Sequence, residues 1–332
     1  MPQSSANNLS FPPPRLPDQL AKLRVDVRAF LAESSVAEPW LPNSDFGAGF
    51  SPEFSRKIAD KGWIGMTWPK QYGGGACSNL ERYVVIEELL AAGAPVFAHW
   101  IADRQSGPLL LRFGSEAQRA ELLPRIAAGE CYFSIGMSEP DSGSDLASVR
   151  TCAERTAQGW RLNGAKVWTS NAHLNHYMIT LCRTGDAGED RHGGLSQFLI
   201  DLHQDGVKIN PIVNMLGAHE FNEVVFDDVE LPGDRLIGQE GDGWRQVTSE
   251  LAYERSGPER FLSNFHIFQA LVDEIGTAPD ARQAEALGRL SGRLWTLRRM
   301  SLSVAAMLEA GKSPDPVLIA DPETDLEALL RA

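Results

Sequence analysis

The sequence lacks any run of 18 consecutive apolar residues, so no membrane-spanning helix is expected anywhere in its 332 residues. It is also short of positive charge, because 31 Lys and Arg stand against 44 Asp and Glu and leave a net charge of −13. That balance speaks against nucleic acid as the main partner, since a phosphate backbone is bound through a positive field. The opening MPQSSANNLSFPPPRLP has neither the basic nor the apolar region of a secretory signal. We therefore expect a cytoplasmic protein with a loose, Pro-rich N-terminal arm.

Cysteine is scarce and scattered. The four thiols are Cys77, Cys131, Cys152 and Cys182. They form no C-x-x-C pair and have no histidines at ligand spacing, which excludes a disulfide framework and a zinc site of the usual kinds. His173 and His176 are three residues apart near the end of a predicted strand, where a turn is expected instead of a metal site. The sequence thus predicts reduced thiols and no bound metal.

Helical periodicity dominates the first 130 residues. One amphipathic helix is predicted by Leu20, Leu23, Val27, Phe30 and Leu31. Another begins at SEAQ, where Ser115 and Gln118 have the spacing of a capping box. The three consecutive glycines of WPKQYGGGACS predict a loop between these helices. We predict a helical domain over residues 1–130.

The apolar period changes to two near Cys131. RTCAERT and RLNGAKVWTS, joined by QGW, predict a hairpin, and HYMITLCRT, LSQFLIDL and EVVFDDVEL predict further strands. Short strands with turn residues at intervals of about ten favour an antiparallel barrel or sandwich over β-α-β units. We predict a β domain over residues 131–242.

Helical periodicity returns at Gly243 and indicates two long amphipathic helices, the second over residues 281–311. These helices predict a C-terminal helical bundle over residues 243–332. The fold class is therefore α+β, with a helical domain, a central antiparallel β domain and a C-terminal bundle.

The stretch LAYERSGPERF interrupts the first of these two helices and carries a carboxylate on its apolar face. From Val247 the apolar stripe steps by four residues to Leu251 and by three to Glu254. A buried carboxylate is costly unless it is paired or used, and Glu250, one turn earlier, has the same charge. Burial and the like charge would both raise the pKa of Glu254, as a general base near neutral pH requires. The alternative is a structural glutamate, paired with a distant arginine beside the kink that Pro258 causes.

Two further segments suggest a planar ligand. YFSIGMSEPDSGSDL runs from a strand into small and hydroxyl-bearing residues, whose backbone amides can approach a ring closely. VWTSNA places Trp168 and Ser170 at a strand end, where an aromatic ring and a hydroxyl can contact the same ligand. Neither segment is a phosphate loop, because G-x-G-x-x-G and Gly-Lys-Ser/Thr are absent from them. Each alone is equally compatible with an ordinary turn or a core tryptophan.

Taken in order, four segments of the chain resemble motifs of the acyl-CoA dehydrogenases. They are WPKQYGGG, MSEPDSGSD, NGAKVWTSN and VVFDDVELPGDRLIGQEGDGW, and the resemblance covers roughly residues 20–275. It implies FAD-dependent α,β-dehydrogenation of an acyl-CoA thioester, in which a carboxylate removes the α-proton and the β-hydride passes to flavin N5. It also implies an electron-transfer flavoprotein as the electron acceptor.

The resemblance assigns the site residue by residue. AYER matches the motif of the isovaleryl and long-chain branches that carries the catalytic base, so this role falls on Glu254. The implied flavin contacts are Ile135, Met137, Ser138, Gly143, Ser144, Trp168, Thr169 and Ser170. The implied substrate contacts are Ser144, Tyr253 and Arg255.

The chain departs from the family pattern in two places. No Arg…Phe-Gly segment follows the first C-terminal helix, and Arg282 is the candidate stand-in. After residue 311 the sequence SPDPVLIADPETDLEALLRA replaces the two further helices of the family, so we expect a shortened C-terminus. Those helices flank a backbone N–H that holds the thioester oxygen, and one such donor is worth about 2.7–4 kcal/mol.

Three hypotheses follow from these departures. The chain is a subunit of a homo-oligomer or of a heterotetramer with a second acyl-CoA dehydrogenase-like chain, it is a non-catalytic or flavin-lacking partner subunit, or it is an acyl-CoA oxidase-like enzyme.

Overall fold

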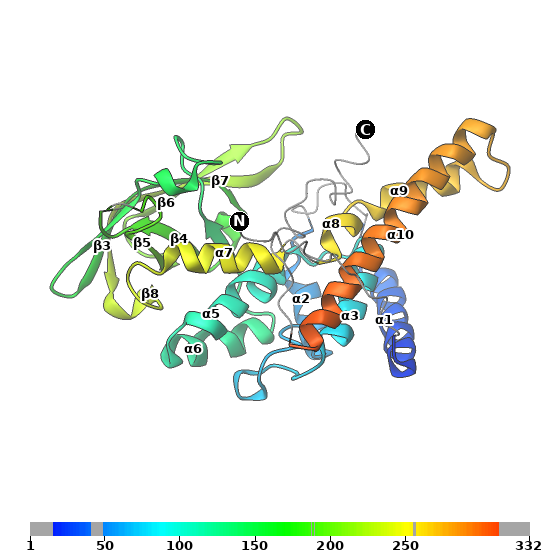
Figure 1. The fold of residues 1–332 in the computed structure, drawn as a ribbon, viewed down its shortest axis with the longest axis horizontal. Coiled ribbons are helices and arrows are strands. Elements are labelled where there is room, and N and C mark those ends of the chain that lie inside the picture. The colour runs from blue at the N-terminus through cyan, green and yellow to red at the C-terminus, as the bar shows by residue number, and fades with distance from the viewer. Residues whose placement is uncertain (1–15, 41–48, 187, 189, 255–256, 312–332) are drawn as a thin grey trace, which may run out of the picture. The chain divides into compact units, whose positions relative to one another are not determined.

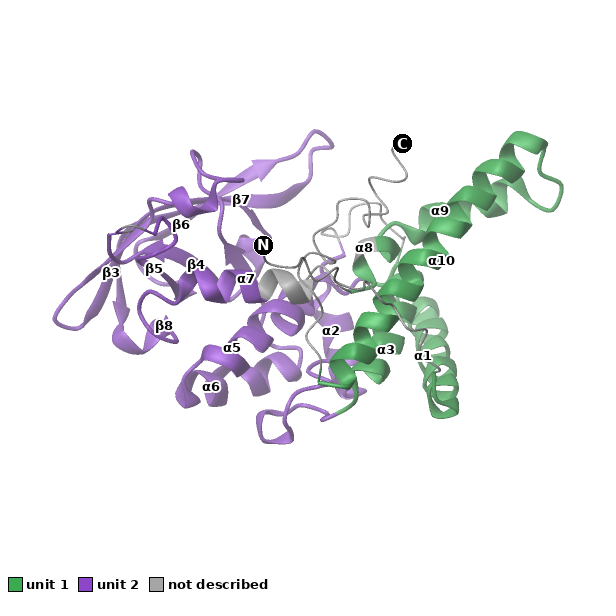
Figure 2. Ribbon diagram, in the orientation of Figure 1, with its two compact units in different colours: residues 1–46, 77–94, 255–332 green, residues 47–76, 95–254 purple. Residues whose placement is uncertain are grey.

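The computed structural model confirms the α+β class: helices precede and follow one central sheet (Figure 1). The chain forms two compact units, and each is described by itself (Figure 2). Unit 1 comprises residues 1–46, 77–94 and 255–332, and unit 2 comprises residues 47–76 and 95–254. The structure describes residues 16–40, 49–186, 188, 190–254 and 257–311, without the side chains of residues 250–254 and 260. The three predicted domains, with boundaries at residues 130 and 242, stay a prediction.

Unit 1 is helical. Its helices are α1 (Asp18–Ala37), α3 (Asn79–Ala91), α8 (Glu259–Leu262), α9 (Phe265–Ile275) and α10 (Ala281–Glu309). α3 packs against both α1 and α10, and Tyr83, Leu302 and Ala305 form a buried cluster between α3 and α10. The predicted apolar face of α1 is confirmed, since Leu20 and Val27 are buried within it. None of the described helices is long and apolar enough to cross a membrane.

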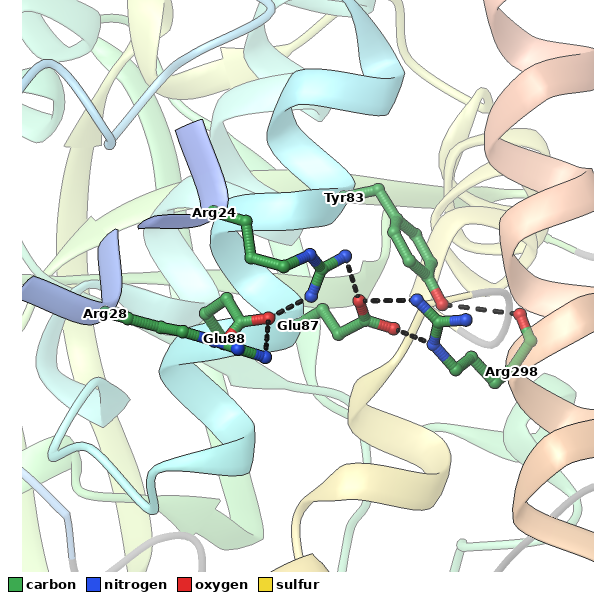
Figure 3. Close-up of polar contacts among 6 residues, drawn as sticks. All are labelled: Arg24, Arg28, Tyr83, Glu87, Glu88 and Arg298. Carbon is green, nitrogen blue, oxygen red and sulfur yellow. Dashed lines mark hydrogen bonds and ion pairs between the residues drawn. The ribbon is translucent and has the colours of Figure 1, made fainter. Parts of the chain in front are cut away.

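A chain of alternating charges lies within unit 1 (Figure 3). Arg298 of α10 binds Glu87 with both ends of its guanidinium, at 2.6 and 3.0 Å. Arg24 of α1 bridges Glu87 and Glu88, and Arg28 binds Glu88 at 2.6 Å. Both carboxylates are only 7% exposed. Three helices that are remote in sequence are therefore joined by one buried ionic network.

Unit 2 contains the remaining helices. They are α2 (Pro52–Asp60), α4 (Phe97–Ile101), the π-helical turn η3 (Ala102–Ser106), α5 (Gly107–Phe113), α6 (Glu116–Ala127) and α7 (Gly243–Glu254). The predicted Gly-rich loop is confirmed apart from one 3₁₀ turn, η2 (Lys70–Tyr72). Its glycines allow close packing, because a Cβ on Gly74 would lie 2.3 Å from the carbonyl oxygen of Trp68.

One sheet of eight strands forms the centre of unit 2. Its strands are β1 (Phe133–Gly136), β2 (Cys152–Arg155), β3 (Gly159–Ser170), β4 (Tyr177–Arg183), β5 (Leu195–Asp201), β6 (Val207–Val213), β7 (His219–Pro232) and β8 (Leu236–Ile237). The order is β6-β7-β3-β2-β4-β5-β8, with β1 beside β4. Short 3₁₀ turns follow at η4 (Leu146–Ser148), η5 (Ala172–Leu174) and η6 (Gly233–Arg235). Most pairings are antiparallel as predicted, but β1 and β2 both run parallel to β4.

The sheet buries a core of large apolar side chains. Trp160 and Phe198 meet edge to face, with ring centroids 5.1 Å apart, and both are at most 2% exposed. Leu162, Val224 and Phe226 complete this cluster. The predicted hairpin β2–β3 is confirmed, with Glu154 opposite Arg161.

The predicted break at Gly-Pro is confirmed in the C-terminal part of the chain. α7 ends at Glu254, and Pro258 is the N-cap residue of α8, where its missing N–H costs no helical hydrogen bond. A second break before Phe265 was not predicted. The predicted helix over residues 281–311 is confirmed as α10.

The capping box of α6 gives a small, direct stability prediction. Ser115 Oγ accepts the N–H of Gln118 at 3.2 Å, and the Gln118 side chain accepts the N–H of Ser115 at 3.0 Å. Ser115→Ala should lower the free energy of unfolding by about 1 kcal/mol in urea titrations, because it leaves one helix N–H unsatisfied. Thr248→Ala in α7 is the control: its hydroxyl donates to the Trp244 and Arg245 carbonyls within the same helix. Equal stability of the two variants would contradict a contribution from the cap.

Candidate functional site

The first predicted flavin segment lies directly beside the strand that carries the second. Ile135 is in β1, opposite Ile179 of β4, and Met137 and Ser138 follow in the loop. The N–H of Val167 in β3 donates to the Ser138 carbonyl at 2.9 Å. The structure therefore brings residues 135–138 and 168–170 together, which the sequence pattern alone did not establish.

A tight turn continues this segment. The backbone groups of Glu139 and Ser142 exchange two hydrogen bonds, at 2.7 and 3.1 Å, and Ser142 Oγ donates to the Asp145 carbonyl. Gly143 and Ser144 follow this turn and are exposed. A Cβ at Gly143 would meet no other atom within 4 Å, so the packing of the described chain does not require a glycine there.

Trp168 adopts an unusual conformation at the end of β3. Its φ is 58°, in the left-handed region, and it lies in an irregularity of the β3–β7 pairing between Lys166 and Thr169. The indole is 61% exposed and touches Phe221 edge to face, with centroids 6.0 Å apart. A left-handed conformation costs about 1–2 kcal/mol for such a residue. The indole is therefore accessible to a ligand ring at the end of β3.

Thr169 and Ser170 are fixed through their backbone carbonyls. Asn222 Nδ2 donates to the Thr169 carbonyl at 3.0 Å, and Ser134 Oγ donates to that of Ser170 at 2.9 Å. The Thr169 hydroxyl is buried and has no hydrogen-bond partner among the described residues. An unsatisfied buried hydroxyl costs about 1–3 kcal/mol, so it is a donor still available to a bound group.

Sequence reasoning missed a buried ion pair beneath this segment. Lys166 of β3 is completely buried, and its Nζ lies 2.7 Å from Glu139 Oε1. Burial lowers the pKa of the Lys166 ammonium. Burial alone would raise the pKa of Glu139, but the charge and hydrogen bond of Lys166 outweigh it and hold that pKa below its usual range. The signal in the sequence was a lysine between the apolar residues Ala165 and Val167 of a predicted strand.

Several histidines are held by hydrogen bonds or ring contacts with neighbouring residues. His99 of α4 is 4% exposed and bonds Ser55 Oγ through Nδ1 at 2.7 Å, and burial lowers its pKa to about 4. His173 stacks on His219 with centroids 3.7 Å apart, whereas His176 Nδ1 accepts the N–H of Tyr132. Within the described part of the chain, no three His, Cys, Asp or Glu side chains are grouped to hold a metal.

Glu254, the predicted catalytic base, is the last residue of α7. The side chains of Glu254 and Tyr253, and the whole of Arg255, lie outside the described residues, so their roles stay predictions. Arg282 is exposed in the first turn of α10. A cavity of about 760 Å³ in unit 1 is lined by the ionic network and by Phe261, Phe265 and Trp295, but by none of the predicted site residues.

Comparisons with known proteins identify the family. The model of the acyl-CoA dehydrogenase N-terminal domain matches residues 17–130, and that of the middle domain matches residues 134–229. Acyl-CoA dehydrogenase IpdE1 of Mycobacterium tuberculosis is 39% identical over 241 residues, which cover 70% of this chain and 62% of that protein. IpdE1 of Mycolicibacterium smegmatis is 32% identical over 316 residues, covering 89% of this chain and 80% of the relative.

The comparison with solved structures points to the same family as these relatives. The ChsE4-ChsE5 complex from Mycobacterium tuberculosis is similar with a TM-score of 0.76 and 28% identity, over 92% of this chain and 80% of that one. The matched models account for the helical segment before the sheet and for most of the sheet itself. The chain belongs to the acyl-CoA dehydrogenase family, whose members depend on FAD. It spans only 62% and 59% of the length of two curated relatives that it matches.

Proposed function

We propose that this chain catalyses α,β-dehydrogenation of an acyl-CoA thioester. The observation that carries the proposal is the strained, exposed Trp168 beside the Met137–Ser138 loop, two segments that the family resemblance assigns to flavin contact. Bound FAD would accept the β-hydride of the substrate. The residues present fit this cofactor, since the Thr169 hydroxyl has no partner among the described residues and the space beside Gly143 is open.

Each residue of the site has a distinct part in the proposal. Trp168 packs against the ring system, and the hydroxyls of Ser138 and Ser170 orient it by hydrogen bonds. Ser144 contacts the thioester, while Tyr253 and Arg255 border the acyl group. Glu254 removes the α-proton, which requires a carboxylate ionised near neutral pH and placed next to the substrate.

The assembly in which this chain works is proposed to be an oligomer completed by a second acyl-CoA dehydrogenase-like chain. Support comes from the similarity to one chain of the ChsE4-ChsE5 complex and from the absence of an Arg…Phe-Gly segment between α9 and α10. The other chain would supply the arginine of that segment. An electron-transfer flavoprotein is the proposed electron acceptor.

The test is spectroscopic and uses the chain as purified, alone and after co-expression with a second family member. A yellow protein with flavin bands near ~450 nm is expected, and anaerobic addition of short, branched and long acyl-CoA esters should bleach the bands with one of them. A colourless protein that no partner chain or added FAD turns yellow would contradict the proposal and favour a flavin-lacking subunit. Rapid recolouring in air after bleaching would instead indicate an acyl-CoA oxidase.

A further inference from the structure

We propose that Lys166 and Glu139 are positioning residues, whose buried ion pair orients the Met137–Ser138 peptide so that its N–H faces the cofactor site. The expected effect on FAD binding rests on the proposed function. The orientation of the peptide rests on the described geometry alone. Both residues lie within motifs that carry the family resemblance, MSEPDSGSD and NGAKVWTSN, but the resemblance assigned a role to neither.

The ion pair holds the loop through a carbonyl group. Lys166 Nζ donates to the Met137 carbonyl at 3.1 Å and to Glu139 Oε1 at 2.7 Å. Glu139 is itself anchored, because its two oxygens accept the N–H groups of Arg150 at 2.7 Å and Thr151 at 2.9 Å. The ammonium therefore has a fixed position, and the Met137 carbonyl is fixed with it.

Planarity of the peptide transmits this constraint to Ser138. No cis peptide bond occurs among the described residues, and in a trans peptide the C=O and N–H point in opposite directions. Because the Met137 carbonyl points to Lys166, the N–H of Ser138 points away from it. No described residue accepts a hydrogen bond from this N–H. The Ser138 carbonyl is held by Val167, so the loop has no freedom to turn the N–H elsewhere.

Burial explains why an ion pair is needed for this task. Lys166 is 0% exposed and Glu139 is 8% exposed, so water cannot replace either partner. A neutral side chain at position 166 would leave the Met137 carbonyl without its donor and the Glu139 carboxylate without a counter-charge. The first loss frees the loop, whereas the second lowers stability, and the two effects are separable.

A single and a double variant separate the effect on FAD binding from the effect on stability. Lys166→Met removes the donor and strands the carboxylate, so both stability and FAD affinity should fall. The double variant Lys166→Met with Glu139→Gln also removes the stranded charge, so its thermal midpoint should recover towards that of the parent chain. Its dissociation constant for FAD, measured by calorimetric titration of the apoprotein, should stay about tenfold weaker, since the loop is still not held. The matched control is Arg161→Met with Glu230→Gln, an exposed ion pair between β3 and β7, which should change neither quantity.

Recovery of both stability and FAD affinity in the double variant would overturn the proposal, because a purely structural pair predicts that result. The amide order parameter of Ser138 in the apoprotein is an independent readout: about 0.85 is expected for the parent chain and below ~0.6 for both variants. If the parent chain binds no FAD, the proposed function fails, and the order parameter still decides whether the pair holds the loop. An unchanged order parameter would overturn the positioning role.

Discussion

Replacing Glu254 with Gln should abolish nearly all turnover while leaving the flavin bound. Proton transfer by a positioned side chain contributes about 10²–10⁴-fold to a rate, and the amide cannot accept the α-proton. Glu254 ends α7 just before the helix break, so it belongs to an element continuous with the buried Val247. The measurement is the rate of anaerobic flavin bleaching by the acyl-CoA ester that bleaches the parent chain.

A neighbouring glutamate provides the control for this prediction. Glu250→Gln removes the same charge one helical turn earlier, so flavin content and most turnover should remain. If Glu250 acts on the predicted base as a like charge one helical turn away, its removal should move the pH–rate profile to lower pH. Unchanged turnover in Glu254→Gln would remove this residue from the mechanism.

The second large effect concerns stability and lies in unit 1. Glu87→Gln should lower the free energy of unfolding by about 3–5 kcal/mol, because it leaves Arg24 and Arg298 facing a neutral amide in a buried position. Burial alone would raise the pKa of Glu87, but its bonds to Arg298 and Arg24 hold that pKa below the usual 4.5. The stability that the ionised carboxylate provides is therefore fully present above pH 4.5 and is lost as the pH falls through the folded-state pKa.

Denaturant titrations of Glu87→Gln and of Glu240→Gln, at neutral pH and near pH 3, test this prediction. Glu240 pairs with Arg155 at 2.7 Å, but the two side chains are 38% and 65% exposed, so its loss should cost less than about 1 kcal/mol. The difference between the Glu87 variant and the parent chain should shrink in acid. Equal costs for the two variants at neutral pH would show that burial does not strengthen the network.

Local chemistry made much of the fold predictable. The capping box at Ser115, the break at Pro258 and the hairpin that begins β3 each depend on residues close in sequence, and the structure confirms them. Strand β6 was missed because it is an edge strand: it alternates between half-buried and exposed residues and contains Pro211, which does not suit a central strand.

The site was predictable only in part, for a different reason. Residue types at Ser138 and Trp168 suggested a ligand, and the resemblance assigned them to one cofactor. Their adjacency depends on the Val167–Ser138 hydrogen bond, and the exposure of Trp168 depends on an irregularity in pairing with β7. Both are tertiary features with no local sequence signal. The same holds for Glu87 and Arg298, which are 211 residues apart.

The 211 residues between Glu87 and Arg298 have a consequence for synthesis of the chain. Ribosomes add about 5–20 residues per second, so Glu87 leaves the peptidyl-transferase centre roughly 10–40 s before Arg298. During that interval α1 and α3 exist without α10, and the acidic pair has only the arginines of α1 to neutralise it. Every residue of β1 to β8 is made within the same interval. The nascent sheet can therefore form first, while the side of α3 that packs against α10 stays uncovered until α10 has been made.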